Sequence, residues 1–154
     1  MGQREFRRQS CGHPALSDGA GDSRPETAVC TAGKRPDHSG RYSLAGLFAL
    51  WASTQTDLFY GVAAASPSVW FPGWMEFEQQ HPMQAQHIYL SLGDKEEHTK
   101  NAVMAAVGDN IRTLHSRLIE RGADCTLEWN SGGHFKNADL RTAKAFRWAM
   151  EENR

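Results

Sequence analysis

The chain has 154 residues, with 17 lysines and arginines against 18 aspartates and glutamates, and a formal net charge of -1. This length suits one domain with a buried core. The nearly balanced charge excludes the strongly basic surface that nucleic acid or anionic lipid would require, so a small molecule is the expected partner.

Residues 1–40 are rich in Gly, Pro, Ser, Asp and Arg and contain few large aliphatic side chains. Such a segment cannot bury enough apolar surface to offset its chain entropy. Pro36 and the charged residues around it also argue against a buried strand ahead of Ser43. We therefore expect residues 1–40 to be disordered or foreign to the fold, and residues 41–154 to form one α/β domain.

The first predicted elements follow this boundary. Residues 44–53 predict a buried helix, because large apolar residues recur among alanines: Leu44, Leu47, Phe48, Leu50 and Trp51. Residues 61–65 form a short apolar run that stops at Ser66 and Pro67. This run predicts a buried strand that ends where proline cannot join a ladder.

Residues 87–93 give the clearest strand pattern, since Ile88, Leu90 and Leu92 alternate with Tyr89 and Ser91. A helix is predicted over about 102–121, with Gly122 at its C-terminal cap. A strand over 124–129, a turn over 130–133 and a helix over 139–152 follow. The alternation predicts a partial parallel sheet of about three strands flanked by helices.

Three residues with catalytic side chains stand at strand ends or at a strand-to-helix junction: Ser43, Asp94 and His134. Catalytic groups gather at the carboxyl ends of parallel strands, and the chain order serine, acid, histidine is that of α/β-hydrolases. A histidine can activate the serine hydroxyl while a carboxylate orients the imidazole. The N–H of Leu44, at the start of a helix, could stabilise an oxyanion.

Four sequence strings support this interpretation by occurring in one order: YSLAGLFA at 42–49, ASPSVW at 65–70, LSLGDKEE at 90–97 and GHF at 133–135. Together they resemble the esterase family of α/β-hydrolases that includes esterase D and siderophore trilactone esterases. The resemblance spans roughly residues 42–150. It implies Ser43 as nucleophile, His134 as base, Asp94 as acid, carboxylic esters or thioesters as substrates, and no metal or organic cofactor.

The chain departs from this family pattern upstream of Ser43. Relatives have glycine two residues before the serine, where this chain has Arg41, and an apolar strand leading into it. The first strands of the family fold have no counterpart here. We therefore expect the N-terminal strands to be missing and Arg41 to crowd the turn.

Several alternatives stay open at this point. Glu96, Glu97 and Asp109 lie near Asp94 and could supply the acid, and Ser43 could simply cap a helix. Aromatic residues near the site are expected to line an apolar substrate pocket: Tyr42, Trp70 and Trp74.

Targeting signals and metal motifs are not evident in the sequence. The arginines near the amino terminus are not followed by the apolar run of a signal peptide, and no stretch is long enough to cross a membrane. Cys11, Cys30 and Cys125 have neither disulfide-framework nor zinc-site spacing. These features predict a soluble cytoplasmic protein that binds no membrane, no nucleic acid and no metal.

The sequence leaves two functions open for this chain. One is a serine esterase with a Ser43, His134 and Asp94 triad. The other is an inactive, truncated remnant of such an enzyme, which at most pairs with another chain, or with a copy of itself, through an exposed sheet edge.

Overall fold

The computed structural model describes residues 37–151. Residues 1–40 were expected to be disordered or foreign to the fold. Of these, residues 1–36 lie outside the described residues, whereas residues 37–40 belong to β1. The described elements are β1 (Asp37–Tyr42), α1 (Ser43–Gln55), β2 (Phe59–Ala65), α2 (Trp74–Gln80), β3 (His87–Gly93), the 3₁₀ helix η1 (Glu96–His98), α3 (Ala102–Ala105), α4 (Val107–Glu120), β4 (Asp124–Asn130) and α5 (Ala138–Glu151).

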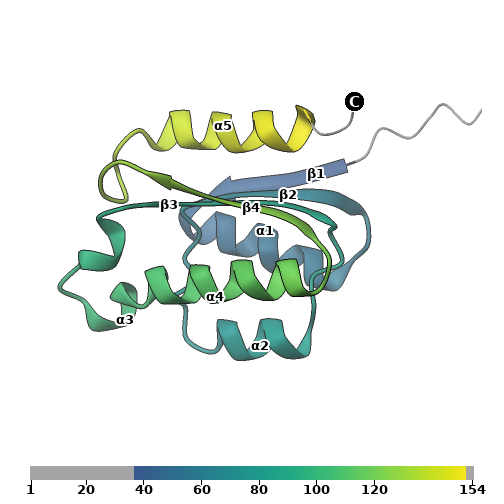
Figure 1. Ribbon diagram of the computed structural model, residues 1–154, viewed down its shortest axis with the longest axis horizontal. Coiled ribbons are helices and arrows are strands. Elements are labelled where there is room, and N and C mark those ends of the chain that lie inside the picture. Colours follow the sequence, from purple (N-terminus) through teal and green to yellow (C-terminus); the bar gives the residue numbers. More distant parts are fainter. Residues whose placement is uncertain (1–36, 152–154) are drawn as a thin grey trace, which may run out of the picture. The chain divides into compact units, whose positions relative to one another are not determined.

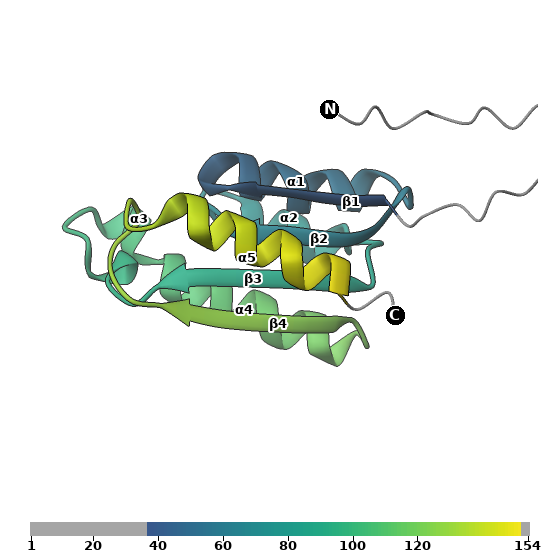
Figure 2. The ribbon, with the colours of Figure 1, turned by 90° about the horizontal axis from the view of Figure 1, so that it is seen from above.

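The strands form one parallel sheet in the order β1-β2-β3-β4. Helix α5 covers one face of this sheet, and α1, α2 and α4 lie on the other (Figures 1 and 2). The α/β class predicted from the alternating patterns is confirmed. Because the strands are parallel, their carboxyl ends meet along one edge, where the loops that follow them converge.

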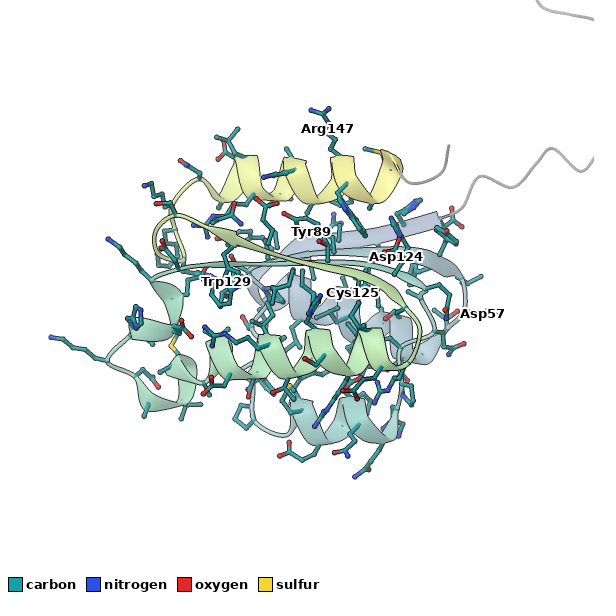
Figure 3. All side chains as sticks on the ribbon, in the orientation of Figure 1. Asp57, Tyr89, Asp124, Cys125, Trp129 and Arg147 are labelled. Carbon is teal, nitrogen blue, oxygen red and sulfur yellow. The ribbon has the colours of Figure 1, made fainter. Side chains whose placement is uncertain are left out.

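Side-chain alternation along the strands divides the core into two parts. Val62 and Ala64 pack on the side of α1 and α4, whereas Ala63 and Ala65 pack under α5. Figure 3 shows Tyr89 on the α5 side and Cys125 on the α4 side of the sheet. β3 lies between β2 and β4 and is buried along its whole length.

Three of the four strands, β2, β3 and β4, lie where the sequence predicted them. The strand β1 was not predicted. Among the described strands β1 pairs only with β2, so it is an edge strand. An edge strand tolerates charge, because a side chain at its margin can reach water. Asp37 and Arg41 are accordingly exposed.

The turn after β1 is not crowded by Arg41, contrary to expectation, because this side chain points to solvent. The position that requires glycine is Gly40. A Cβ there would lie 2.7 Å from the carbonyl oxygen of Ala63 and 2.9 Å from Cζ of Phe146 on α5. Glycine at this position therefore lets α5 pack closely on β1.

Two further departures concern helices. The segment after Pro72 contains α2, which is tied to α4 by Glu78, a fully buried carboxylate that accepts from Arg117 and Arg121. The single helix predicted over 102–121 is divided into α3 and α4 at Ala106. Gly122 has φ +84°, as its predicted role in the C-terminal cap requires.

Among residues 37–151, no helix is long and apolar enough to cross a membrane.

Candidate active site

Ser43 occupies a strained turn between β1 and α1. Its φ is +59°, a left-handed conformation that costs a residue with a Cβ roughly 1–2 kcal/mol. The serine makes no helix-capping hydrogen bond, because Tyr42 holds the N-cap position. The capping alternative is therefore wrong for this serine. A sharp strand-to-helix turn that exposes Oγ is the geometry of a nucleophile elbow.

His134, in the loop between β4 and α5, lies against this serine. Its Nε2 is 2.9 Å from Oγ of Ser43, and its Nδ1 is 2.6 Å from Oε2 of Glu96. An ionised carboxylate only accepts hydrogen bonds, so Nδ1 carries the proton and Nε2 accepts from the serine hydroxyl. Serine, imidazole and carboxylate thus form a continuous hydrogen-bonded chain.

The carboxylate in this chain is Glu96, which corrects the expectation placed on Asp94. Oδ1 of Asp94 instead accepts the backbone N–H of Gly132 at 2.7 Å. Asp94 thereby ties the loop after β3 to the loop after β4. The physical reason is that η1 carries Glu96 back over the strand end, a path that strand prediction alone does not specify.

The position of Glu96 is fixed mainly through its other oxygen. Oε1 accepts from the N–H of Gly93 at 2.7 Å and from the hydroxyl of Ser66 at 2.8 Å, and it lies 3.0 Å from Nη1 of Arg141. Burial alone would raise the pKa of Glu96, but the hydrogen bonds from His134, Gly93 and Ser66 lower it below its ordinary value. The carboxylate is therefore ionised at neutral pH.

The loops that carry Glu96 and His134 touch closely at Gly93. A Cβ at this position would lie 2.2 Å from the carbonyl oxygen of Gly132, so only glycine allows the contact. Tyr42 supports the same loop, since its hydroxyl donates to the carbonyl oxygen of His134 and the two rings are 5.2 Å apart. Tyr42 therefore holds the histidine rather than lining the cavity.

Ser43, Glu96 and His134 open into a cavity of about 290 Å³. Its wall includes Trp70 and combines apolar residues with hydroxyl groups and one amine: Ser66, Pro67, Ser68, Lys95, Thr99, Met104, Val107 and Phe135.

Trp74, the other tryptophan expected at the pocket, lies elsewhere. It lines a neighbouring groove of about 450 Å³ together with other apolar residues, among them Leu44, Phe48, Trp51 and Phe71. This groove is larger than the cavity, but Ser43, His134 and Glu96 are not among its lining residues. The smaller cavity is therefore the candidate site.

Leu44 is the second residue of α1. An N–H in the first turn of a helix has no acceptor within the helix, and it lies at the positive end of the helix dipole. Position 44 is thus suited to the oxyanion role that the sequence suggested.

Comparisons with solved structures find similar folds in three hydrolases. The chain resembles the siderophore hydrolase EstA from Aspergillus nidulans (21% identity, TM-score 0.50). It also resembles the enterobactin esterase FES from Shigella flexneri (18%, 0.54) and an IroE-like serine hydrolase from Shewanella oneidensis (14%, 0.53). The chain shares the fold of these hydrolases. The resemblance to siderophore esterases that the sequence strings indicated is thereby confirmed for the fold.

These matches cover 73% of this chain but only 47%, 30% and 38% of the respective solved chains. The chain therefore spans less than half the length of each. No protein-family model matches the sequence, and no curated protein does so either.

The strain at Ser43 leads to a stability prediction. We expect Ser43→Gly to be more stable than Ser43→Ala by about 1 kcal/mol, because glycine adopts a positive φ without a steric penalty. Both variants lack the hydroxyl, so the loss of its hydrogen bond cancels in the comparison. Urea denaturation at one pH measures the difference, and equal unfolding free energies would mean that the turn is not strained.

Proposed function

We propose that this chain is a serine hydrolase that cleaves carboxylic esters, with Ser43, His134 and Glu96 as its catalytic triad. The observation that carries the proposal is the continuous chain of hydrogen bonds from the hydroxyl of Ser43 through the imidazole to the carboxylate. The strained conformation of Ser43 and the fold shared with known esterases support it.

In the first half of the reaction, Oγ of Ser43 attacks the ester carbonyl carbon while Nε2 of His134 takes the hydroxyl proton. Glu96 stabilises the resulting imidazolium. The oxyanion of the tetrahedral intermediate accepts the N–H of Leu44. Collapse of the intermediate breaks the bond to the alkoxy group, which leaves as an alcohol with the proton from His134.

In the second half, water replaces the alcohol. His134 takes a proton from the water as the water oxygen attacks the acyl carbon. The second tetrahedral intermediate then collapses to a free carboxylic acid, as His134 returns the proton to Oγ of Ser43. The hydroxyl groups and Lys95 in the cavity wall favour a small ester that carries a polar or anionic substituent.

Hydrolysis of p-nitrophenyl acetate and butyrate tests this triad. We expect Ser43→Ala to reduce the rate to background and Glu96→Gln to lower kcat by roughly 10³-fold or more, since the amide cannot stabilise the imidazolium. Asp94→Asn is the matched control. It should keep most of the activity, because the amide oxygen can still accept the N–H of Gly132.

If Asp94→Asn were as damaging as Glu96→Gln, the assignment of the acid would be wrong. If the wild-type rate did not exceed that of Ser43→Ala, the chain would not be an esterase.

We also propose that two copies of the chain pair through β1. Within residues 37–151 this strand pairs on one side only, and its other edge is a place for a second strand to add. Beside it, α1 exposes a stripe of apolar side chains at helical spacing: Leu44, Phe48 and Trp51. An edge strand next to exposed apolar surface is suited to self-association.

Charge favours one register for this pair. If two copies of β1 align antiparallel about Ser39, Asp37 of each copy lies opposite Arg41 of the other. Both side chains are exposed. Opposite charges across an antiparallel pair contribute roughly 0.2–1 kcal/mol each, whereas like charges destabilise it.

Sedimentation velocity tests this pairing. Wild type should sediment as a dimer. Arg41→Asp or Asp37→Arg alone should shift it toward monomer, because each change places like charges opposite one another. The double variant Asp37→Arg, Arg41→Asp should restore the dimer. A monomeric wild type, or single variants that remain dimeric, would contradict the pairing.

A further inference from the structure

Arg141, on α5, is a buried cation that extends to the catalytic end of the sheet. Its side chain is only 3% exposed. Nη1 lies 3.0 Å from Oε1 of Glu96, 3.3 Å from the hydroxyl of Ser66 and 3.4 Å from that of Tyr42. Nη2 donates to the backbone carbonyls of Ser131 and Gly133, each at 3.3 Å.

These partners belong to separate segments of the chain. Tyr42 ends β1, Ser66 follows β2 and Glu96 follows β3. The two carbonyls lie in the loop after β4 that carries His134. One guanidinium therefore links all four strand ends. Its planar array of N–H donors makes this possible, whereas a lysine amine has fewer donors and a different geometry.

The ion pair between Arg141 and Glu96 is buried, so losing either partner would leave an unpaired charge away from water. A charge removed from water is stable only when it is paired and hydrogen-bonded, and Glu96, 5% exposed, provides the paired carboxylate. The two oxygens of Glu96 face different partners. Oε1 faces Arg141, Ser66 and the N–H of Gly93, which leaves Oε2 for His134.

We propose that Arg141 is a positioning residue for the triad, which holds Glu96 and the His134 loop in the geometry that activates Ser43. This inference rests on the proposed esterase function. Arg141 contacts neither Ser43 nor the imidazole through any hydrogen bond found in residues 37–151. It acts through the carboxylate and through the carbonyls of Ser131 and Gly133.

The guanidinium also offsets part of the charge that Glu96 presents to His134. The other charged or titratable groups around this pair are Lys95 in the cavity wall, Tyr42 beside the imidazole and Asp94 on the N–H of Gly132. Without Arg141, Oε1 of Glu96 would lose its buried cationic partner. The carboxylate would then be held less firmly with Oε2 toward Nδ1 of His134.

The test compares Arg141→Met and Arg141→Lys with Lys144→Met as the matched control. Lys144 lies one turn further along α5, its side chain is 58% exposed, and its partner is Glu128. We expect Arg141→Met to lower kcat/KM for p-nitrophenyl acetate by roughly 10- to 100-fold. Most of this loss should fall on kcat rather than on KM, because Arg141 is not part of the cavity wall.

The kcat/KM of Arg141→Lys should lie between those of wild type and Arg141→Met, because lysine keeps the charge but has fewer hydrogen-bond donors. The control should leave both quantities unchanged. If Arg141→Met does not fold by circular dichroism, the lysine variant alone decides the outcome. Folded variants with the kcat of wild type would overturn the positioning role, since a purely structural residue would change only stability.

A second readout separates this proposal from the esterase proposal. The short hydrogen bond from His134 to Glu96 should give a far-downfield Nδ1 proton signal in the NMR spectrum of wild type, shifted or absent in Arg141→Met. A variant signal identical to wild type would contradict the role of Arg141, whether or not the chain hydrolyses esters. A changed signal in a chain without hydrolysis would contradict the esterase proposal alone.

Discussion

The positive φ of Ser43 turns the chain from β1 directly into α1, and the site depends on this turn. In an ordinary N-cap, the serine oxygen would accept from the first turn of its own helix. Here Tyr42 takes that position, and Oγ of Ser43 is directed to Nε2 of His134. The roughly 1–2 kcal/mol of backbone strain persists because β1 and α1 are both packed into the core.

The parallel sheet supplies the remaining geometry. Strands that run in one direction bring their ends to one edge, so Ser43, Glu96 and His134 meet although more than 90 residues separate the first from the last. The loops at this edge are then fixed by buried polar contacts. Asp94 joins two of them, and Arg141 extends from α5 to four strand ends. Two strained residues, Ser43 and Ser66, lie in this same region.

The sequence was sufficient for elements with a strong pattern and for residues at strand ends. The alternation of β3 and the order of Ser43 and His134 predicted the sheet and two members of the hydrogen-bonded chain. The sequence did not distinguish Glu96 from Asp94 as the carboxylate, because the path of η1 depends on loop contacts such as the close approach at Gly93. The sequence patterns also failed to predict β1, whose charges suit an edge strand but not a central one. Arg141 had no sequence signal, since an arginine on a helix is usually solvated.

A fluorophosphonate probe tests most directly whether His134 and Glu96 activate the hydroxyl of Ser43. Such a probe phosphonylates an activated serine and leaves ordinary serines unreacted. Mass spectrometry of the treated wild-type chain should find one adduct, on the peptide containing Ser43, and none in Ser43→Ala. An unmodified wild-type chain, or an adduct on another residue, would contradict the account.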